Sequence, residues 1–184
     1  MNLNLNRRQW LGALGMGMGA LGMMGKPAQA ERGVFTKPAS MKVGLVTYNL
    51  AKDMDLDTLI DTCTKAQIQG VELRTTHAHQ VEVDLNKEQR DAVKKKFADS
   101  PVELMGLGSA FDYHTSDQGK LRADIEATKE YIILAHDVGA SGVKVRPNGF
   151  PKDVPREKTL EQIGKSLHEI AEFGSQHGIQ IRLE

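Results

Sequence analysis

Residues 179–184 read Ile-Gln-Ile-Arg-Leu-Glu, a strict alternation of aliphatic and polar side chains. Successive side chains of a β-strand point to opposite faces, so one face of this strand is aliphatic and the other is polar or charged. The same alternation occurs in Val71-Glu72-Leu73-Arg74 and in Val143-Lys144-Val145-Arg146. Strands of a parallel sheet that is covered on both faces are apolar throughout. The three segments therefore favour a sheet that carries helices on one face and charged side chains on the other.

Helix signals fill the intervals between these strands. Asp55 and Asn86 are placed as helix N-caps, and Gln89 stands three residues after Asn86, as in a capping box. The predicted helices cover residues 55–69, 86–99, 119–138 and 159–176, the last one capped by Thr159, and the predicted strands cover 42–48, 71–75, 102–107, 142–146 and 179–183. This order is typical of parallel βαβ units in an α/β protein. We predict a (β/α)₈ barrel with a charged interior, ahead of an open doubly wound sheet.

Such a barrel needs about 200–250 residues. Residues 41–184 contain four βα units and a fifth strand, so we expect them to be the N-terminal part of a truncated barrel. The alternative is a half-barrel that closes by dimerisation, and we keep a homo-oligomer open for that reason.

The first thirty residues have the layout of an export signal. Arg7 and Arg8 precede an apolar, glycine-rich run over residues 10–25, and Ala28-Gln29-Ala30 forms a small-x-small cleavage site. The run is too short to serve as a membrane anchor, which is the alternative interpretation. We predict a twin-arginine signal over residues 1–30, a linker over 31–40, a periplasmic or otherwise exported protein, and no stable membrane span after cleavage.

Charge and cysteine content narrow the function classes. Without Arg7, Arg8 and Lys26 the chain keeps 21 basic and 24 acidic side chains, and no basic block remains that would neutralise a run of phosphates. We therefore expect no nucleic-acid partner. Cys63 is the only cysteine, which excludes an internal disulfide.

Polar side chains gather where the predicted strands end, and the carboxyl ends of barrel strands carry the active site. The sequence contains no Walker loop, dinucleotide fingerprint or nucleophile elbow. Glu184 follows the fifth strand and suits a hard divalent cation, although an ion pair with Lys144, Arg146 or Arg182 is the alternative. The candidate substrate-binding residues at the strand ends are Tyr48, Arg74, His77, His79, His114, Lys144 and Arg146. Structural ion pairs with Glu72 and Glu184 remain the alternative for Lys144 and Arg146.

The sequence resembles the xylose-isomerase-like TIM barrels, the group that includes sugar phosphate isomerases, epimerases and endonuclease IV. The segments that carry the resemblance are Gly70–Arg74, Asp137–Val145 and Gly178–Glu184, and the segment Glu72–His79 looks most like an exported subgroup. The resemblance covers residues 41–184, the first half of the family fold.

This resemblance implies a divalent metal, Mn, Mg, Co or Zn, held by carboxylates and histidine at strand ends. Glu184 matches in position the glutamate that ends strand five, which is a metal ligand and acid/base group in that family, and the other expected ligands lie after residue 184. The implied function is a metal-dependent isomerase or epimerase of a sugar or sugar phosphate, with a small-molecule carbohydrate as partner. The alternatives are a non-catalytic carbohydrate-binding TIM barrel and an endonuclease-IV-like phosphodiesterase.

Overall fold

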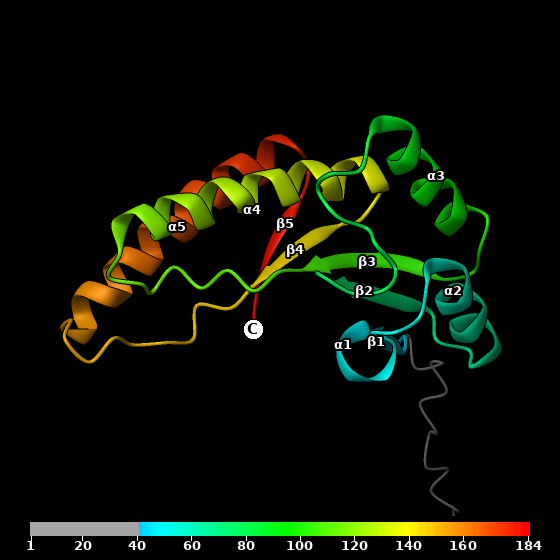
Figure 1. Ribbon diagram of the computed structural model, residues 1–184, viewed down its shortest axis with the longest axis horizontal. Helices are drawn as coiled ribbons and strands as arrows, with labels where there is room; N and C mark the ends of the chain where they lie inside the picture. Colours follow the sequence, from blue (N-terminus) through cyan, green and yellow to red (C-terminus); the bar gives the residue numbers. More distant parts are fainter. Residues whose placement is uncertain (1–40) are drawn as a thin grey trace, which may run out of the picture. The chain divides into compact units, whose positions relative to one another are not determined.

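The computed structural model describes residues 41–184, so the predicted signal and linker lie outside the described residues. Five strands alternate with helices along the chain (Figure 1). The strands are β1 (Gly44–Val46), β2 (Gly70–Arg74), β3 (Glu103–Gly108), β4 (Gly142–Val145) and β5 (Gln180–Leu183). The helices are α1 (Thr47–Leu50), α2 (Leu56–Lys65), α3 (Lys87–Ala98), α4 (Gln118–Val138) and α5 (Arg156–Gln176).

The strands form one parallel sheet in the order β1-β2-β3-β4-β5. Each strand pairs with the next one in the chain, for example with Leu45 opposite Val71 and Lys144 opposite Arg182. A doubly wound sheet reverses its strand order at a switch point. The unbroken order is that of a barrel, so the predicted α/β architecture is confirmed as part of a TIM-barrel-like sheet.

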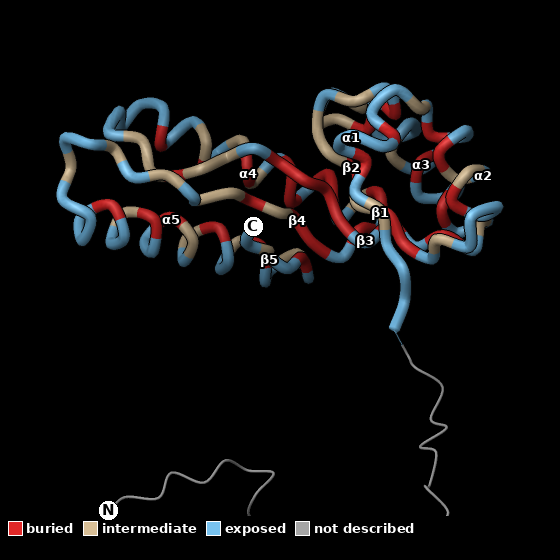
Figure 2. Tube along the Cα trace, turned by 90° about the horizontal axis from the view of Figure 1, so that it is seen from below, coloured by how far each residue is buried: buried red, intermediate tan, exposed pale blue. Residues whose placement is uncertain are grey.

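The two faces of the sheet differ as the alternation predicts. Val71, Leu73, Val143 and Val145 are buried, and the helices pack over them. Figure 2 shows buried positions running along the central strands and recurring on the inner sides of α4 and α5. The opposite face carries charged side chains near the carboxyl ends of the strands. Removing the aliphatic side chains from water therefore holds the layers together and leaves the charged face for chemistry.

Two of the predicted helix caps are confirmed by hydrogen bonds. The Asp55 carboxylate accepts from the Thr58 amide at 2.8 Å. Asn86 and Gln89 form the full capping box, because each side chain accepts from the backbone amide of the other at 2.9 Å. Each cap satisfies an amide that would otherwise lack an intrahelical partner.

Two predicted boundaries are wrong. Helix α5 begins at Arg156 after Pro155, and Thr159 is a buried residue inside its first turn rather than the cap. Pro155 is the N-cap residue, with an extended ψ of 135° and no side-chain cap hydrogen bond, so this helix begins without the hydroxyl cap that the sequence predicted. The first strand ends at Val46, because Thr47–Leu50 already form a helical turn.

Candidate functional site

An ion cluster lies on the charged face of the sheet, near the carboxyl ends of β2, β4 and β5. The Lys144 Nζ atom is 2.7 Å from Glu72 Oε1 and 2.8 Å from Glu184 Oε2. The side chains of Lys144 and Glu72 are both 14% exposed, whereas that of Glu184 is 50% exposed. Glu184 is therefore the member that faces outward, and Lys144 holds it in place from inside.

The cluster favours the charged forms of Lys144 and Glu184. Burial disfavours the Lys144 ammonium, but hydrogen bonds to Glu184 and Glu72 outweigh it and raise its pKa. The hydrogen bond from Lys144 lowers the pKa of the Glu184 carboxyl. The ion pair that the sequence left as the alternative for Lys144 and Glu184 is thus present.

Gly108 makes room for this cluster, because Glu72 and Lys144 lie on the two strands that flank β3. A Cβ atom at Gly108 would lie 2.9 Å from Glu72 Oε1, closer than van der Waals contact allows. Sequence reasoning missed Gly108. The signal was available in Gly106-Leu107-Gly108, where glycine at alternate strand positions marks a face that another group approaches closely.

Arg74 and His77 stand at the end of β2 and are positioned by Thr47. The Thr47 hydroxyl oxygen accepts from the Arg74 amide at 3.0 Å and lies 2.9 Å from His77 Nδ1. The Arg74 guanidinium lies over the Tyr48 ring, 4.4 Å from its centre. Burial, followed by the charge of Arg74, lowers the pKa of His77. The structure therefore groups three predicted site residues, and it adds Thr47, which the sequence did not single out.

Within the described part of the chain, the side chain of His79, unlike that of His77, is hydrogen-bonded through both ring nitrogens. Its Nε2 atom is 2.7 Å from the Arg74 carbonyl oxygen, and its Nδ1 accepts from the Val81 amide at 3.0 Å. The residue is only 6% exposed, and burial lowers its pKa. Both ring nitrogens thus hold the β2–α3 loop, and neither is available to a ligand in this conformation.

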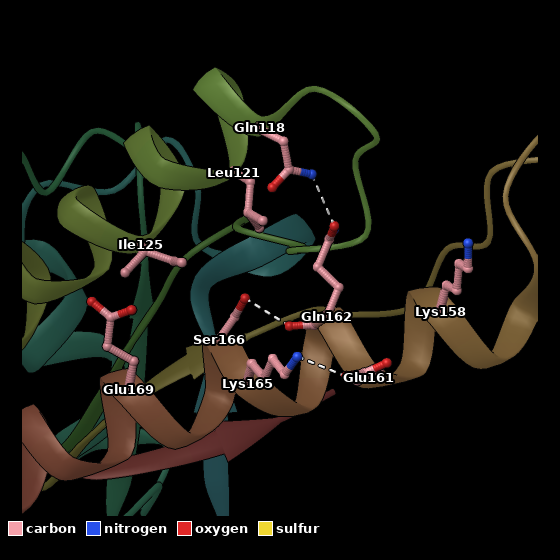
Figure 3. A pocket seen from close by; sticks show the side chains of 9 residues that line it. All are labelled: Gln118, Leu121, Ile125, Lys158, Glu161, Gln162, Lys165, Ser166 and Glu169. Atoms are coloured by element: carbon pink, nitrogen blue, oxygen red, sulfur yellow. Dashed lines mark hydrogen bonds and ion pairs between the residues drawn. The ribbon is translucent and has the colours of Figure 1, made fainter.

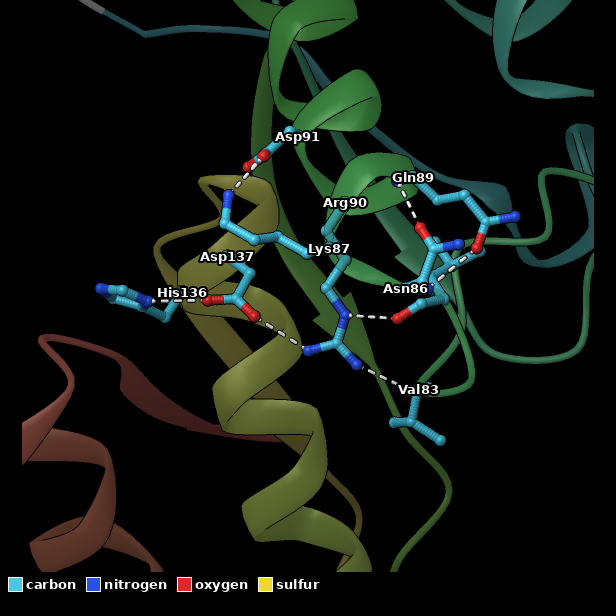
Figure 4. Close-up of polar contacts among 9 residues, drawn as sticks. Val83, Asn86, Lys87, Gln89, Arg90, Asp91, His136 and Asp137 are labelled. Atoms are coloured by element: carbon cyan, nitrogen blue, oxygen red, sulfur yellow. Dashed lines mark hydrogen bonds and ion pairs between the residues drawn. The ribbon is translucent and has the colours of Figure 1, made fainter.

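The rest of the β2–α3 loop is anchored from α3 and α4. Arg90 donates to the carbonyl oxygens of Leu85 and Val83 at 2.8 and 2.6 Å, and to Asp137 Oδ2 on α4 at 2.9 Å (Figure 4). Glu82 accepts from the Thr76 amide at 2.6 Å. These contacts hold the segment that follows Arg74 in one conformation, which positions the side chains at the end of β2.

His114 and Arg146 follow β3 and β4. His114 Nδ1 lies 3.6 Å from Asp112 Oδ1, and neither atom has a hydrogen-bond partner in the described residues. The Arg146 amide donates to the Phe111 carbonyl oxygen at 2.8 Å, which joins the two loops, while its buried Nε atom is likewise without a partner. His114 lines a hollow whose residues do not include those of the ion cluster, so the predicted site residues divide into two groups.

A groove lies between α4 and α5, on the helix side of the molecule (Figure 3). Its volume is about 450 Å³, and its walls include Gln118, Gln162 and Lys165. Gln118 donates to Gln162 at 3.1 Å, and Lys165 pairs with Glu161 at 2.7 Å. These polar groups satisfy one another, and the groove is not at the strand ends where a barrel carries its chemistry.

A metal ion needs several donor side chains in one place. Within residues 41–184 no three His, Cys, Asp or Glu side chains come together in a way that would hold a metal ion. Glu184 is a single oxygen donor and is already paired with Lys144. The described residues therefore do not form a complete metal site, and we derive no reaction step through a metal. None of the helices within residues 41–184 is long and apolar enough to cross a membrane.

The chain belongs to the xylose isomerase-like TIM barrel family, whose model matches residues 60–184. No curated protein matches the sequence.

Similar solved structures share the fold at low identity. The IolI protein "with a binding zinc atom" is 17% identical with a TM-score of 0.67, over 78% of this chain and 51% of that one. D-psicose 3-epimerase in the presence of D-fructose is 14% identical with a TM-score of 0.63, over 77% and 51%. L-ribulose 3-epimerase is 16% identical with a TM-score of 0.61, over 78% and 49%. The chain spans about half the length of these structures.

Proposed function

We propose that this chain is the N-terminal part of a sugar isomerase or epimerase, and that Glu184 is one of its proton-transferring groups. The observation that carries the proposal is the Glu72–Lys144–Glu184 cluster at the carboxyl ends of the strands. The family and the sugar epimerases among the similar structures support a carbohydrate as substrate.

Each residue of the cluster has a distinct role in this proposal. The Glu184 carboxylate, half exposed and ionised, takes the proton from a C–H group beside a sugar carbonyl. Lys144 orients that carboxylate and carries positive charge toward the oxygen on which negative charge develops. Glu72 holds Lys144 from the other side. Arg146 and Arg74, whose charges act on Glu184, bind sugar hydroxyl or phosphate groups together with His77 beside Arg74.

A divalent metal is part of the proposal at the level of the whole protein. Such a metal would supply Lewis acidity to the substrate. Glu184 would be one ligand, and the remaining ligands would have to come from residues outside the described ones. The zinc of the IolI structure supports this expectation, and it does not identify the metal here.

Exchange of substrate hydrogen with deuterated water tests the reaction class. Ketohexoses and ketopentoses are incubated in D₂O with the whole protein, including the part that would supply the remaining metal ligands. Loss of the proton signal beside the carbonyl is followed by NMR with and without added Mn²⁺ or Zn²⁺. We expect exchange that Glu184→Gln abolishes. The matched control is Glu130→Gln, at an exposed glutamate on α4, which should exchange as the unaltered protein does. Equal exchange in both variants would remove Glu184 from the reaction.

A carbohydrate-binding barrel without turnover is the second candidate. It is favoured by the pairing of Glu184 with Lys144, which engages the carboxylate oxygen Oε2. Sugar binding without any deuterium exchange, in the presence of each metal, would decide for this candidate.

We also propose export by the twin-arginine route, on the basis of Arg7, Arg8 and the apolar run that follows. Residues 1–30 are fused to a reporter protein and its location is measured. We expect the reporter to be found in the periplasm. Replacing both Arg7 and Arg8 by lysine should keep the reporter in the cytoplasm. Unchanged location in the Lys variant would contradict the proposal.

A further inference from the structure

A hollow of about 470 Å³ lies between the β3–α4 loop, residues 109–117, and the β4–α5 loop, residues 146–155. Both loops leave the carboxyl ends of their strands and run side by side in Figures 1 and 2. The residues that line it are Asp112, His114, Thr115, Ser116, Lys120, Gly149, Phe150 and Pro151. A smaller adjoining hollow shares His114, Thr115 and Ser116 and reaches Thr159. The proposed function uses neither hollow.

Unpartnered polar atoms gather at this hollow. Asp112 Oδ1 and His114 Nδ1 at this hollow, and Thr159 Oγ1 at the adjoining one, are buried, and none has a hydrogen-bond partner within residues 41–184. A buried polar atom without a partner costs about 1–3 kcal/mol, so folded proteins seldom keep several together unless a ligand or water completes them. Asp112 and His114 are 3.6 Å apart, too far for a direct hydrogen bond.

The surrounding loops hold these two side chains in place. Tyr113, between them, has a φ of 55° and is fully buried, with its hydroxyl 2.6 Å from Thr128 Oγ1. Gln162 on α5 donates to the Tyr113 and Thr115 carbonyl oxygens at 2.9 and 2.8 Å. A tyrosine in the left-handed region is costly, and such strain persists only where the structure around it enforces it. The hollow is therefore preorganised.

Gly149 and Phe150 form the opposite wall. A Cβ atom at Gly149 would lie 2.2 Å from His114 Nε2, so only glycine lets this loop approach the imidazole. Phe150 is 41% exposed, and the Arg156 guanidinium lies 4.2 Å from its ring centre. The wall thus combines an apolar aromatic surface with the polar groups of the facing loop.

The chemistry of the lining selects the ligand. Lys120 is paired with Asp124, and the Asp112 carboxylate opposes an anion, so a phosphate is disfavoured. A carboxylate, an imidazole and two hydroxyls beside an aromatic ring suit a neutral polyol with an apolar face, which is a sugar ring. We propose that this hollow is a second sugar subsite, and that the substrate is a disaccharide or glycoside rather than a monosaccharide. This inference rests on the proposed function for the ring that lies at Glu184.

Titration of the ¹⁵N-labelled protein with maltose, cellobiose and D-glucose tests the inference by NMR. We expect at least one disaccharide to bind more tightly than D-glucose and to shift the amide signals of His114 and Phe150. Asp112→Asn and Phe150→Ala should each weaken disaccharide binding about tenfold, the loss of one hydrogen bond to a charged group or of an aromatic contact. Phe150→Ala keeps the test valid if Asp112→Asn fails to fold, because Phe150 is an exposed side chain.

The matched controls are Asp153→Asn in the β4–α5 loop and Leu160→Ala on α5, two exposed positions that do not line the hollow. Both should bind as the unaltered protein does. Any of three results would overturn the subsite. They are equal affinity for D-glucose and the disaccharides, no disaccharide binding at all, and unchanged binding in Asp112→Asn and Phe150→Ala. Disaccharide binding at these loops without deuterium exchange at Glu184 would instead overturn the proposed function and leave the subsite standing.

Discussion

Lys144 joins two carboxylates that would otherwise repel each other on the same face of the sheet. Glu72 on β2 and Glu184 after β5 both pair with it, so the lysine links the second strand of the described sheet to the end of the last one. When one partner of a charge pair this close to the interior is removed, the remaining charge loses its counter-ion, and the folded protein is destabilised. The cluster is therefore expected to matter for stability as well as for chemistry.

Replacing Lys144 by methionine should lower the free energy of unfolding by about 2 kcal/mol, less than for a fully buried pair because Glu184 is half exposed. The measurement is urea unfolding at neutral pH. The double variant Glu72→Gln/Lys144→Met should recover part of the loss, since the glutamine leaves no unpaired charge inside. Losses that simply add in the double variant would show that the two residues do not interact.

Because His79 is buried, we predict that the free energy of unfolding depends on pH. Burial lowers its pKa below the ordinary value of 6.5, so the unfolded chain takes up the proton more readily than the folded one. Stability should be full above about pH 6.5 and should decline as the pH falls below it through the folded pKa. His77, whose pKa is also lowered, adds to the same decline.

Urea unfolding at about pH 7.5 and 5.5 measures this effect. His79→Gln should be less stable at the higher pH, because its ring bonds to the loop backbone are lost, and should lose less between the two values. His168→Gln is the control, since that side chain is 76% exposed on α5. A pH dependence in His79→Gln equal to that of the unaltered protein would contradict this assignment.

At the scale of elements, two glycines show that the surroundings of a glycine decide whether its replacement by alanine stabilises or destabilises the protein. Gly108 lies in β3 beneath the Glu72 carboxylate, whereas Gly164 lies inside α5 with no atom within 4 Å of the position of a Cβ. Gly108→Ala should destabilise the protein by about 1–3 kcal/mol through overpacking. Gly164→Ala should stabilise it by about 1 kcal/mol, the helix propensity difference. Thermal unfolding of both variants checks the pair, and two changes of the same sign would refute it.

The sequence predicted the elements better than their ends. The capping box at Asn86 involves residues three apart, so local sequence contains all of it. The start of α5 cannot be read from local sequence in this way, because both Pro155 and Thr159 are acceptable near the start of a helix. Only the packing of the folded chain buries Thr159. The end of β1 likewise depends on Thr47, which bonds to the amide of Arg74 twenty-seven residues away.

At the scale of the whole molecule, the donor set predicts weak metal binding by this chain. Residues 41–184 bring no three metal-ligating side chains together, and Glu184 is engaged by Lys144. Equilibrium dialysis with Mn²⁺ and Zn²⁺ should give dissociation constants of about 1 mM or weaker, near −4 kcal/mol, and Glu184→Ala should not change them. Submicromolar binding of one ion that Glu184→Ala removes would show a complete site.

The alternation of aliphatic and charged residues in three strands was enough to predict a parallel α/β sheet with one apolar and one charged face, because side-chain direction in a strand follows from position alone. The same pattern placed Lys144, Arg74 and Glu184 on one face. It could not show which of them touch, since Glu72, Lys144 and Glu184 come from strands far apart in the chain and meet across Gly108. Nor could it separate His77 from His79, two residues apart, because the bonds that occupy both nitrogens of His79 come from the folded loop around it.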